Sequence, residues 1–181
     1  GVPVTVGLSG RVCPDHFFVT NIEDCQRWGE RQGLAFLISE SAGLCNRCSP
    51  HIEGVLAVCV VDALAGINTP RKIGPMLRLA DVVVITKGDI VSQAEREVFA
   101  FNLRRANPRA AVILFNGLTG QGALPLSHHL LAAPETGPLD GQRLRFSMPS
   151  GVCPYCVGET TIGRDHQRGN VRKIAFAGEE A

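Results

Sequence analysis

The sequence predicts an α/β fold with a doubly wound, mostly parallel sheet and a small β-rich segment at its carboxyl end. Short apolar runs alternate four times over with amphipathic helical stretches, which is the pattern of parallel strands joined by crossover helices. Several runs are apolar throughout, as strands buried on both faces are. With 181 residues, of which 45% are hydrophobic and 19% charged, the chain can form one sizeable core.

The expected elements follow in order along the chain. Strands are predicted at residues 2–6, 34–39, 54–62, 81–86 and 110–115, and helices at residues 22–32, 72–79, 92–105 and 122–131. Asn21 is the expected cap of the first of these helices, and Ser92 with Glu95 has the spacing of a capping box at the start of another.

The organisation changes after residue 131. Residues 132–141 are rich in Pro and Gly and indicate a linker between a domain at 1–131 and a C-terminal segment at 142–181. Short strands are expected there at residues 143–147, 159–163 and 170–176. A segment of this size holds little core, so a metal or docking on the main sheet would help to stabilise it.

Composition excludes several classes of function. The net charge is +1, from 18 Lys and Arg against 17 Asp and Glu, so nucleic acid and membrane surfaces are not expected partners. No apolar run reaches the length of about 18 residues that a membrane span needs, and a cytoplasmic location is expected. Four of the seven cysteines form Cys-x-x-Cys pairs, which favours metal or redox chemistry over structural disulfides.

The first thiol pair follows a candidate ligand-binding carboxylate. The apolar run at 34–39 ends at Glu40, and Gly43, Cys45 and Cys48 come next. A carboxylate at the carboxyl end of a parallel strand lies where open α/β sheets bind ligands, and thiolates at this spacing suit one metal ion or iron–sulfur cluster. A redox dithiol has the same spacing.

Other candidate metal ligands are spread along the chain. The second Cys-x-x-Cys pair makes a site of four thiolates conceivable. Further candidates are single thiol and imidazole side chains, which lie in sequence near the first pair or near the amino end of the chain. These candidates are Cys153 and Cys156, and more weakly Cys13, His16 and His51. Cys25 and Cys59 lie in apolar patterns and are expected in the core.

A turn at residues 86–89 has the chemistry to recognise guanine. The stem of Lys87 can lie along a purine plane, and Asp89 can accept hydrogen bonds from guanine N1 and N2. Thr86 ends the preceding apolar run. One strand–helix unit later, Asn116, Gly117 and Leu118 begin a glycine-rich loop whose backbone amides could close over the other edge of the base.

The order of these motifs resembles one family over about residues 13–131. The chain is similar to the nucleotide-binding domain of the accessory GTPases that mature nickel enzymes, namely the hydrogenase and urease accessory GTPases and their cobalamin-synthesis relatives. The resemblance implies a P-loop NTPase type of fold. It also implies that Glu40 and Gly43 serve catalysis, that residues 86–89 and 116–118 bind GTP or GDP with Mg²⁺, and that Cys45 and Cys48 bind metal.

The resemblance also implies partners and a missing part. Expected partners are a client metalloenzyme or other maturation proteins, a homodimer is compatible with the family, and the expected metal is nickel, zinc or an iron–sulfur cluster. The phosphate-binding sequence Gly-x-x-x-x-Gly-Lys-Ser/Thr does not occur in these 181 residues. We therefore expect an amino-terminally incomplete copy of such a GTPase, which does not hydrolyse GTP well by itself.

Three functions remain open at this point. The first is a GTP-binding metallocentre-maturation protein that uses GTP binding and hydrolysis to control metal transfer. The second is a non-hydrolysing iron–sulfur or zinc scaffold, in which the α/β domain is a support. The third is a thiol–disulfide redox protein, although Pro50 and the loop character around Cys45 differ from the helix start that such proteins use.

Overall fold

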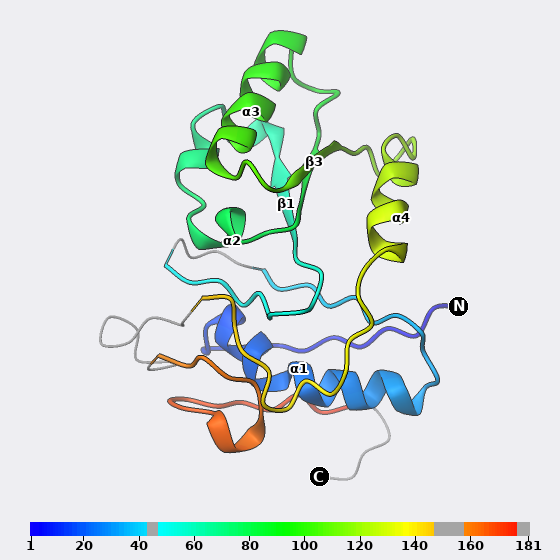
Figure 1. Cartoon of the computed structure of the whole chain (residues 1–181), viewed down its shortest axis with the longest axis vertical. Coiled ribbons are helices and arrows are strands. Elements are labelled where there is room, and N and C mark those ends of the chain that lie inside the picture. The colour runs from blue at the N-terminus through cyan, green and yellow to red at the C-terminus, as the bar shows by residue number, and fades with distance from the viewer. Residues whose placement is uncertain (43–46, 147–157, 177–181) are drawn as a thin grey trace.

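The computed structural model describes residues 1–42, 47–146 and 158–176 (Figure 1). Within this part of the chain, three parallel strands form a sheet in the order β1 (Val58–Asp62), β2 (Val82–Thr86) and β3 (Ala111–Leu114). In the register, Val58 lies opposite Val82, and Val82 lies opposite Ala111. The predicted α/β class with a parallel sheet is therefore confirmed.

Helices cover both faces of this sheet. On one face, α2 (Pro75–Arg78) and α3 (Gln93–Ala106) supply Leu77, Phe99 and Leu103 to a core shared with alternate strand residues. The other face is smaller and packs against α4 (Ala123–Leu131) through Leu126. Figure 1 shows α3 and α4 on opposite sides of the strands. The carboxyl ends of the strands remain open between the helices that follow them.

Local sequence explains where α3 begins. The Ser92 hydroxyl accepts from the Glu95 amide at 3.2 Å, and the Glu95 carboxylate accepts from the Ser92 amide at 3.0 Å. This is the capping box that the sequence predicted. Of the short helix expected at 72–79, only α2 at Pro75–Arg78 is helical, and Gly74 with φ 71° lies immediately before it. A separate 3₁₀ turn at Thr69–Arg71 precedes the expected range.

The first helix is longer than the sequence analysis indicated. α1 spans Pro14–Arg31, so it begins eight residues before the expected start and includes the candidate ligand His16. Pro14 occupies the first turn, where its missing N–H costs nothing, and Asp15 stands at the positive end of the helix dipole. None of the helices in the described part of the chain has the length and apolarity to span a membrane.

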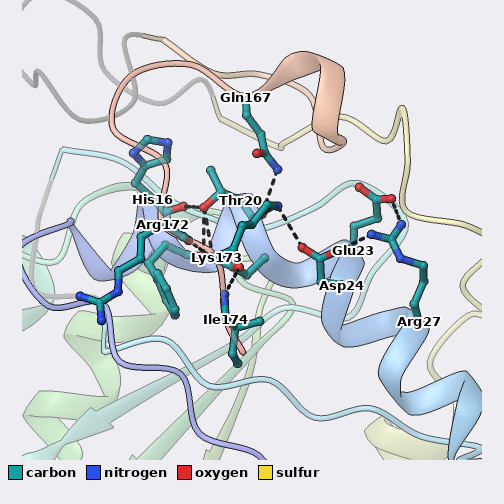
Figure 2. Close-up of polar contacts among 11 residues, drawn as sticks. His16, Thr20, Glu23, Asp24, Arg27, Gln167, Arg172, Lys173 and Ile174 are labelled. Atoms are coloured by element: carbon teal, nitrogen blue, oxygen red, sulfur yellow. Dashed lines mark hydrogen bonds and ion pairs between the residues drawn. The ribbon is translucent and has the colours of Figure 1, made fainter. Parts of the chain in front are cut away.

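The C-terminal segment packs along α1. Leu144 and Ile162 join Val19 and Ile22 of α1 in a buried cluster. Figure 2 shows the polar contacts of the same surface, where the Lys173 ammonium lies 2.9 Å from Asp24 Oδ2. The described parts of the segment therefore pack against α1 through both apolar and charged side chains.

An asparagine side chain completes this contact. Asn21 donates from Nδ2 to the Arg172 carbonyl at 2.8 Å and accepts from the Ile174 amide at 2.8 Å. Gln167 donates from Nε2 to the Thr20 carbonyl at 2.9 Å. Asn21, expected as a helix cap, instead holds the backbone of the C-terminal segment from the middle of α1.

Several predicted strands were wrong. Residues 2–6 and 34–39 form neither a strand nor a helix, and most of their apolar side chains are exposed. Apolar runs form strands only when a neighbouring strand satisfies their backbone groups, and within the described residues nothing pairs with the outer edge of β1. In the described parts of 143–147, 159–163 and 170–176, pairing is limited to the isolated bridges Ile52–Leu144 and Arg143–Thr161.

One arginine connects the C-terminal segment to the sheet. Arg145 makes a two-pronged ion pair with Asp81, the residue before β2, at 2.8 and 2.7 Å. It also donates to the carbonyls of Ile52, Val55 and Leu79 at 2.6–3.1 Å. Five hydrogen bonds from one guanidinium fix residues near position 145 against the amino end of β2.

Candidate nucleotide-binding and thiol sites

A pocket opens at the carboxyl ends of β2 and β3. Its volume is about 110 Å³, which is below the 300–1,000 Å³ of sites that enclose a whole ligand and suits one ring system. The lining combines apolar strand ends with polar side chains of the two following loops: Ile85, Gly88, Asp89, Arg96, Leu114, Phe115, Asn116 and Gln121. The two loops predicted to bind guanine therefore meet in one cavity.

The turn after β2 is anchored on both sides of this pocket. The Thr86 hydroxyl lies 3.4 Å from the Val61 carbonyl, so it faces β1 and not the pocket. Lys87 has φ 56°, a left-handed conformation that costs a residue with a side chain about 1–2 kcal/mol, and its ammonium lies 2.6 Å from Asp62 Oδ2. The side chain of Asp89 is exposed and lines the pocket.

Arg96 holds the same turn from the other side. Its Nη1 donates to the Gly88 carbonyl at 3.2 Å. A Cβ atom built on Gly88 would lie 3.2 Å from the Arg96 Cδ, so the stem of Arg96 covers this glycine. The absence of a side chain at position 88 is what allows the arginine to reach into the pocket.

The loop after β3 is shaped by Asn116. Its Oδ1 accepts from the amides of Leu118 and Thr119 at 2.9 and 3.2 Å, and its backbone exchanges hydrogen bonds with Gly120 and Gln121. Asn116 therefore uses its side-chain oxygen to build the loop. Leu118 is 97% exposed at the tip of the loop, beside the pocket.

A second polar site lies at the amino-terminal end of α1. Cys48 is 3% exposed, and its thiol lies 3.5 Å from Asp15 Oδ2, while Ser41 donates to Asp15 Oδ1 at 3.0 Å. Burial raises the pKa of the Asp15 carboxyl, and the hydrogen bonds from Ser41 and Cys48 oppose this shift in part. The thiol of one predicted metal ligand is thus held beside a buried acid.

His16 and Glu159 form a buried pair next to this acid. His16 Nε2 lies 3.1 Å from Glu159 Oε2, and both side chains are 1% exposed. The distance between His16 Nε2 and Glu159 Oε2 is that of an ion pair, but the two groups are not aligned as in a hydrogen bond. Neither ring nitrogen of His16 has a hydrogen-bond partner among the described residues. Glu159 Oε1 accepts from the Arg168 amide at 2.6 Å.

The remaining predicted ligands are placed as follows. Glu40 is exposed and does not line the pocket at the ends of β2 and β3, and Cys13 is half-buried immediately before α1. His51 Nε2 lies 2.9 Å from the Met76 carbonyl, and burial lowers the pKa of this imidazole. Gly117 lies exposed on the Asn116 loop.

Four predicted site residues lie outside the described residues: Gly43, Cys45, Cys153 and Cys156. Within residues 1–42, 47–146 and 158–176, no group of three or more His, Cys, Asp or Glu side chains is arranged to hold a metal ion. Cys59 is buried in the sheet core, as expected, and burial raises the pKa of its thiol to about 11.

Sequence reasoning missed four residues of these sites. Asp62 ends an apolar run just as Glu40 does. This position at the end of a strand was the only sequence feature that could have marked Asp62 as a site residue. Arg96, Asp15 and Glu159 carry no motif; Arg96 contacts Gly88 eight residues earlier, whereas Asp15 and Glu159 act through contacts between segments that are distant in sequence. Such contacts have no local signature in a single chain.

Comparison with known proteins agrees with this geometry. Residues 28–114, which include all three strands and the turn at 86–89, match the family model for the nucleotide-binding domain of CobW, HypB and UreG. The chain is also 47% identical over 174 residues to an uncharacterized protein of Methanocaldococcus jannaschii, and the match covers 96% of this chain and 74% of that protein. The chain belongs to the CobW/HypB/UreG family. This confirms the resemblance seen in the order of its motifs.

A solved structure in the same family is also similar in part. The hydrogenase maturation factor HypB of Archaeoglobus fulgidus is 27% identical, with a TM-score of 0.37. The match covers 41% of this chain and 37% of that chain, so it spans well under two thirds of either protein.

Proposed function

We propose that this CobW/HypB/UreG family chain binds guanine nucleotides at the carboxyl ends of β2 and β3 and serves the maturation of a metal centre. The observation that carries the proposal is the pocket that joins Asp89 to the Asn116 loop. Asp89 is a pure acceptor, and guanine presents paired donors at N1 and N2 where adenine has none in that arrangement. A base seated in the pocket would meet its acceptor at Asp89.

The nucleotide is GTP or GDP with Mg²⁺. Lys87 would lie along the base or ribose, and Glu40 with Gly43 would serve the phosphate end, where Mg²⁺ supplies charge for the phosphoryl group. Glu40 is exposed, and its neighbour Ser41 is bonded to Asp15 of α1. Movement of this segment would therefore link nucleotide binding to the thiol site.

The metal is cargo, and the proposed ligands are Cys45, Cys48, Cys153 and Cys156, with Cys13 and His16 as weaker candidates. Two described side chains support a soft metal such as nickel, zinc or an iron–sulfur cluster, because Cys48 is buried and the buried ring nitrogens of His16 have no hydrogen-bond partner among the described residues.

Chain geometry supports one shared centre. Cys48 contacts Asp15, and Glu159 contacts the adjacent His16. Glu159 follows Cys156 by three residues, and three residues of extended chain reach at most about 11 Å. Cys48 of the first pair and Glu159, a described neighbour of the second, thus contact the same end of α1, which supports the proposal of a four-thiolate site over two independent ones.

Nucleotide titration tests the first half of the proposal. Fluorescent GDP should bind more tightly than the matching ADP, and Asp89→Asn should lose about 1–3 kcal/mol of that preference, because one charged contact to two donors is removed. Asp165→Asn, an exposed acid on the turn at Arg164–His166, is the control. Equal affinities for GDP and ADP in the unmodified chain would refute guanine recognition.

Anaerobic metal analysis tests the second half. If the centre is shared, Cys45→Ser/Cys48→Ser and Cys153→Ser/Cys156→Ser should each remove all bound metal, whereas independent sites would lose half each. Cys25→Ser, a half-buried thiol of α1 outside both pairs, is the control. Full metal content in both double variants would rule these cysteines out as ligands.

The second candidate function is a non-hydrolysing iron–sulfur or zinc scaffold. The contacts of Cys48 and Glu159 with the amino-terminal end of α1 favour it, because a metal centre shared there would hold the C-terminal segment in place without any nucleotide. GDP-dependent change in the rate of metal release to a chelator would support the maturation function, and a rate unaffected by bound GDP would support the scaffold.

A further inference from the structure

We propose that Arg96 is a second base-reading residue, which donates to N7 of guanine on the edge opposite to Asp89. The inference rests on the proposed nucleotide site and deepens it. No motif of the sequence points to this residue, which lies seven positions after Asp89 on the first turn of α3.

The position of Arg96 is fixed by its own helix. The capping box of Ser92 and Glu95 sets the start of α3, and Arg96 follows Glu95 directly. Its stem packs over Gly88, and its Nη1 donates to the Gly88 carbonyl at 3.2 Å. The guanidinium is therefore held beside the turn at 86–89 before any ligand arrives, which lowers the entropy cost of binding.

Guanine presents acceptors on its second edge, and Arg96 is the lining residue that offers a charged donor. Guanine has acceptors at N7 and O6 besides the donors that Asp89 takes. The Thr86 hydroxyl faces the Val61 carbonyl, away from the pocket. Arg96 is the cationic side chain among the lining residues, and its remaining N–H groups have no partner in the described part of the chain.

Discrimination against adenine arises mainly at the Asp89 edge. Adenine shares the N7 acceptor with guanine, so a bond from Arg96 to N7 strengthens binding of either purine. An amino group replaces O6 in adenine, so a second donor of Arg96 directed at that position would meet another donor. The carboxylate of Asp89 would lose its two donors at the other edge. Asp89 therefore provides most of the preference for guanine, and Arg96 adds to the strength of binding.

A ligand analogue separates base reading from a purely structural role. The chain as it stands, together with Arg96→Met and Arg96→Lys, is titrated with GDP, ADP and 7-deaza-GDP, in which carbon replaces N7. Methionine keeps much of the stem over Gly88 but removes the donors. Arg104→Met, an exposed arginine in the last turn of α3, controls for loss of one charge from the helix.

We expect the unmodified chain and Arg104→Met to bind 7-deaza-GDP about 10- to 150-fold more weakly than GDP, as loss of a hydrogen bond to a charged donor requires. Arg96→Met should bind both ligands equally and at the weaker level, and Arg96→Lys should keep part of the difference. If Arg96 only braces Gly88, the methionine variant will weaken both ligands by the same factor, and the proposal is overturned.

Failure of this inference is distinct from failure of the nucleotide site. A chain that prefers GDP to ADP but binds 7-deaza-GDP as well as GDP retains the proposed function and rejects the role of Arg96. A chain without preference between GDP and ADP rejects both.

Discussion

The ammonium of Lys87 lies 2.6 Å from Asp62 Oδ2, so an ion pair joins the carboxyl ends of β1 and β2 beside the pocket. Asp62 Oδ1 accepts from the Leu64 amide at 2.8 Å, which holds the carboxylate toward Lys87. The hydrogen bond from Lys87 lowers the pKa of Asp62. The ion pair thus fixes the side chain of Lys87, whose backbone is in a disfavoured left-handed conformation.

A double-mutant cycle measures this ion pair. Asp62→Asn and Lys87→Met should show a coupling of about 0.2–1 kcal/mol in the free energy of unfolding, a small value because both side chains are exposed. The coupling should shrink in about 1 M salt, where charges are screened beyond about 3 Å. Chemical denaturation of the four proteins at low and high salt gives both values. Additive effects at low salt would contradict the expected coupling.

Loss of the Arg145 guanidinium should weaken the link between the C-terminal segment and the sheet. Arg145→Met leaves Asp81 and three backbone carbonyls without their donor and should cost about 2 kcal/mol in the free energy of unfolding. Arg143→Met, an exposed arginine two residues earlier, should change stability by less than about 0.5 kcal/mol. Urea denaturation monitored by the single tryptophan provides the measurement.

The same contact predicts a pH dependence. Burial acts to raise the pKa of Asp81, but the hydrogen bonds from Arg145 and the Ala57 amide outweigh it, so the net pKa is lowered. A lowered folded-state pKa contributes stability above the unfolded value of about 3.9, and this contribution is lost as the pH falls through the folded value. The unmodified chain should therefore lose stability in acid more steeply than Arg145→Met. Parallel acid profiles would contradict this account.

The buried pair of His16 and Glu159 should be non-additive. Removing one partner leaves a polar group without compensation in a site that is 1% exposed, so His16→Gln and Glu159→Gln should each cost about 2–4 kcal/mol. The loss in free energy of unfolding in the double variant should be smaller than the sum of the two single losses, because the double variant leaves neither native side chain without its partner. Thermal unfolding of the single and double variants tests this, and Asp165→Asn is the surface control. A double variant that costs the full sum would mean that the two side chains do not interact.

The sequence predicted the elements that their own residues specify. The strands at β1, β2 and β3 and the start of α3 were found because apolar runs and a capping box are local signals. The run at 34–39 has an equally strong local signal but forms no strand in the structure, since a strand also needs a partner.

The candidate site was predictable to the same extent. The turn containing Lys87 and Asp89 and the loop at Asn116 follow directly from strand ends, so their meeting in one pocket could be expected. The contact between His16 and Glu159 joins residues 143 positions apart, and nothing local to either residue indicates it. Pairings of this kind are decided by how α1 and the C-terminal segment pack.

Gly122 gives the sharpest test of the pocket loop. It precedes α4 with φ 83°, and a Cβ atom there would lie 2.0 Å from the backbone oxygen of Leu114, a contact that no side-chain rotation can relieve. Gly120, with φ 77°, has no atom within 4 Å of such a Cβ atom. Gly120→Ala should therefore lower the free energy of unfolding only by the backbone strain of about 1–2 kcal/mol. Gly122→Ala should lower it by several kcal/mol or displace the loop from the end of β3. Unfolding free energies and GDP titrations of the two variants measure this difference, and equal effects would show that the close approach of position 122 to Leu114 does not shape the pocket.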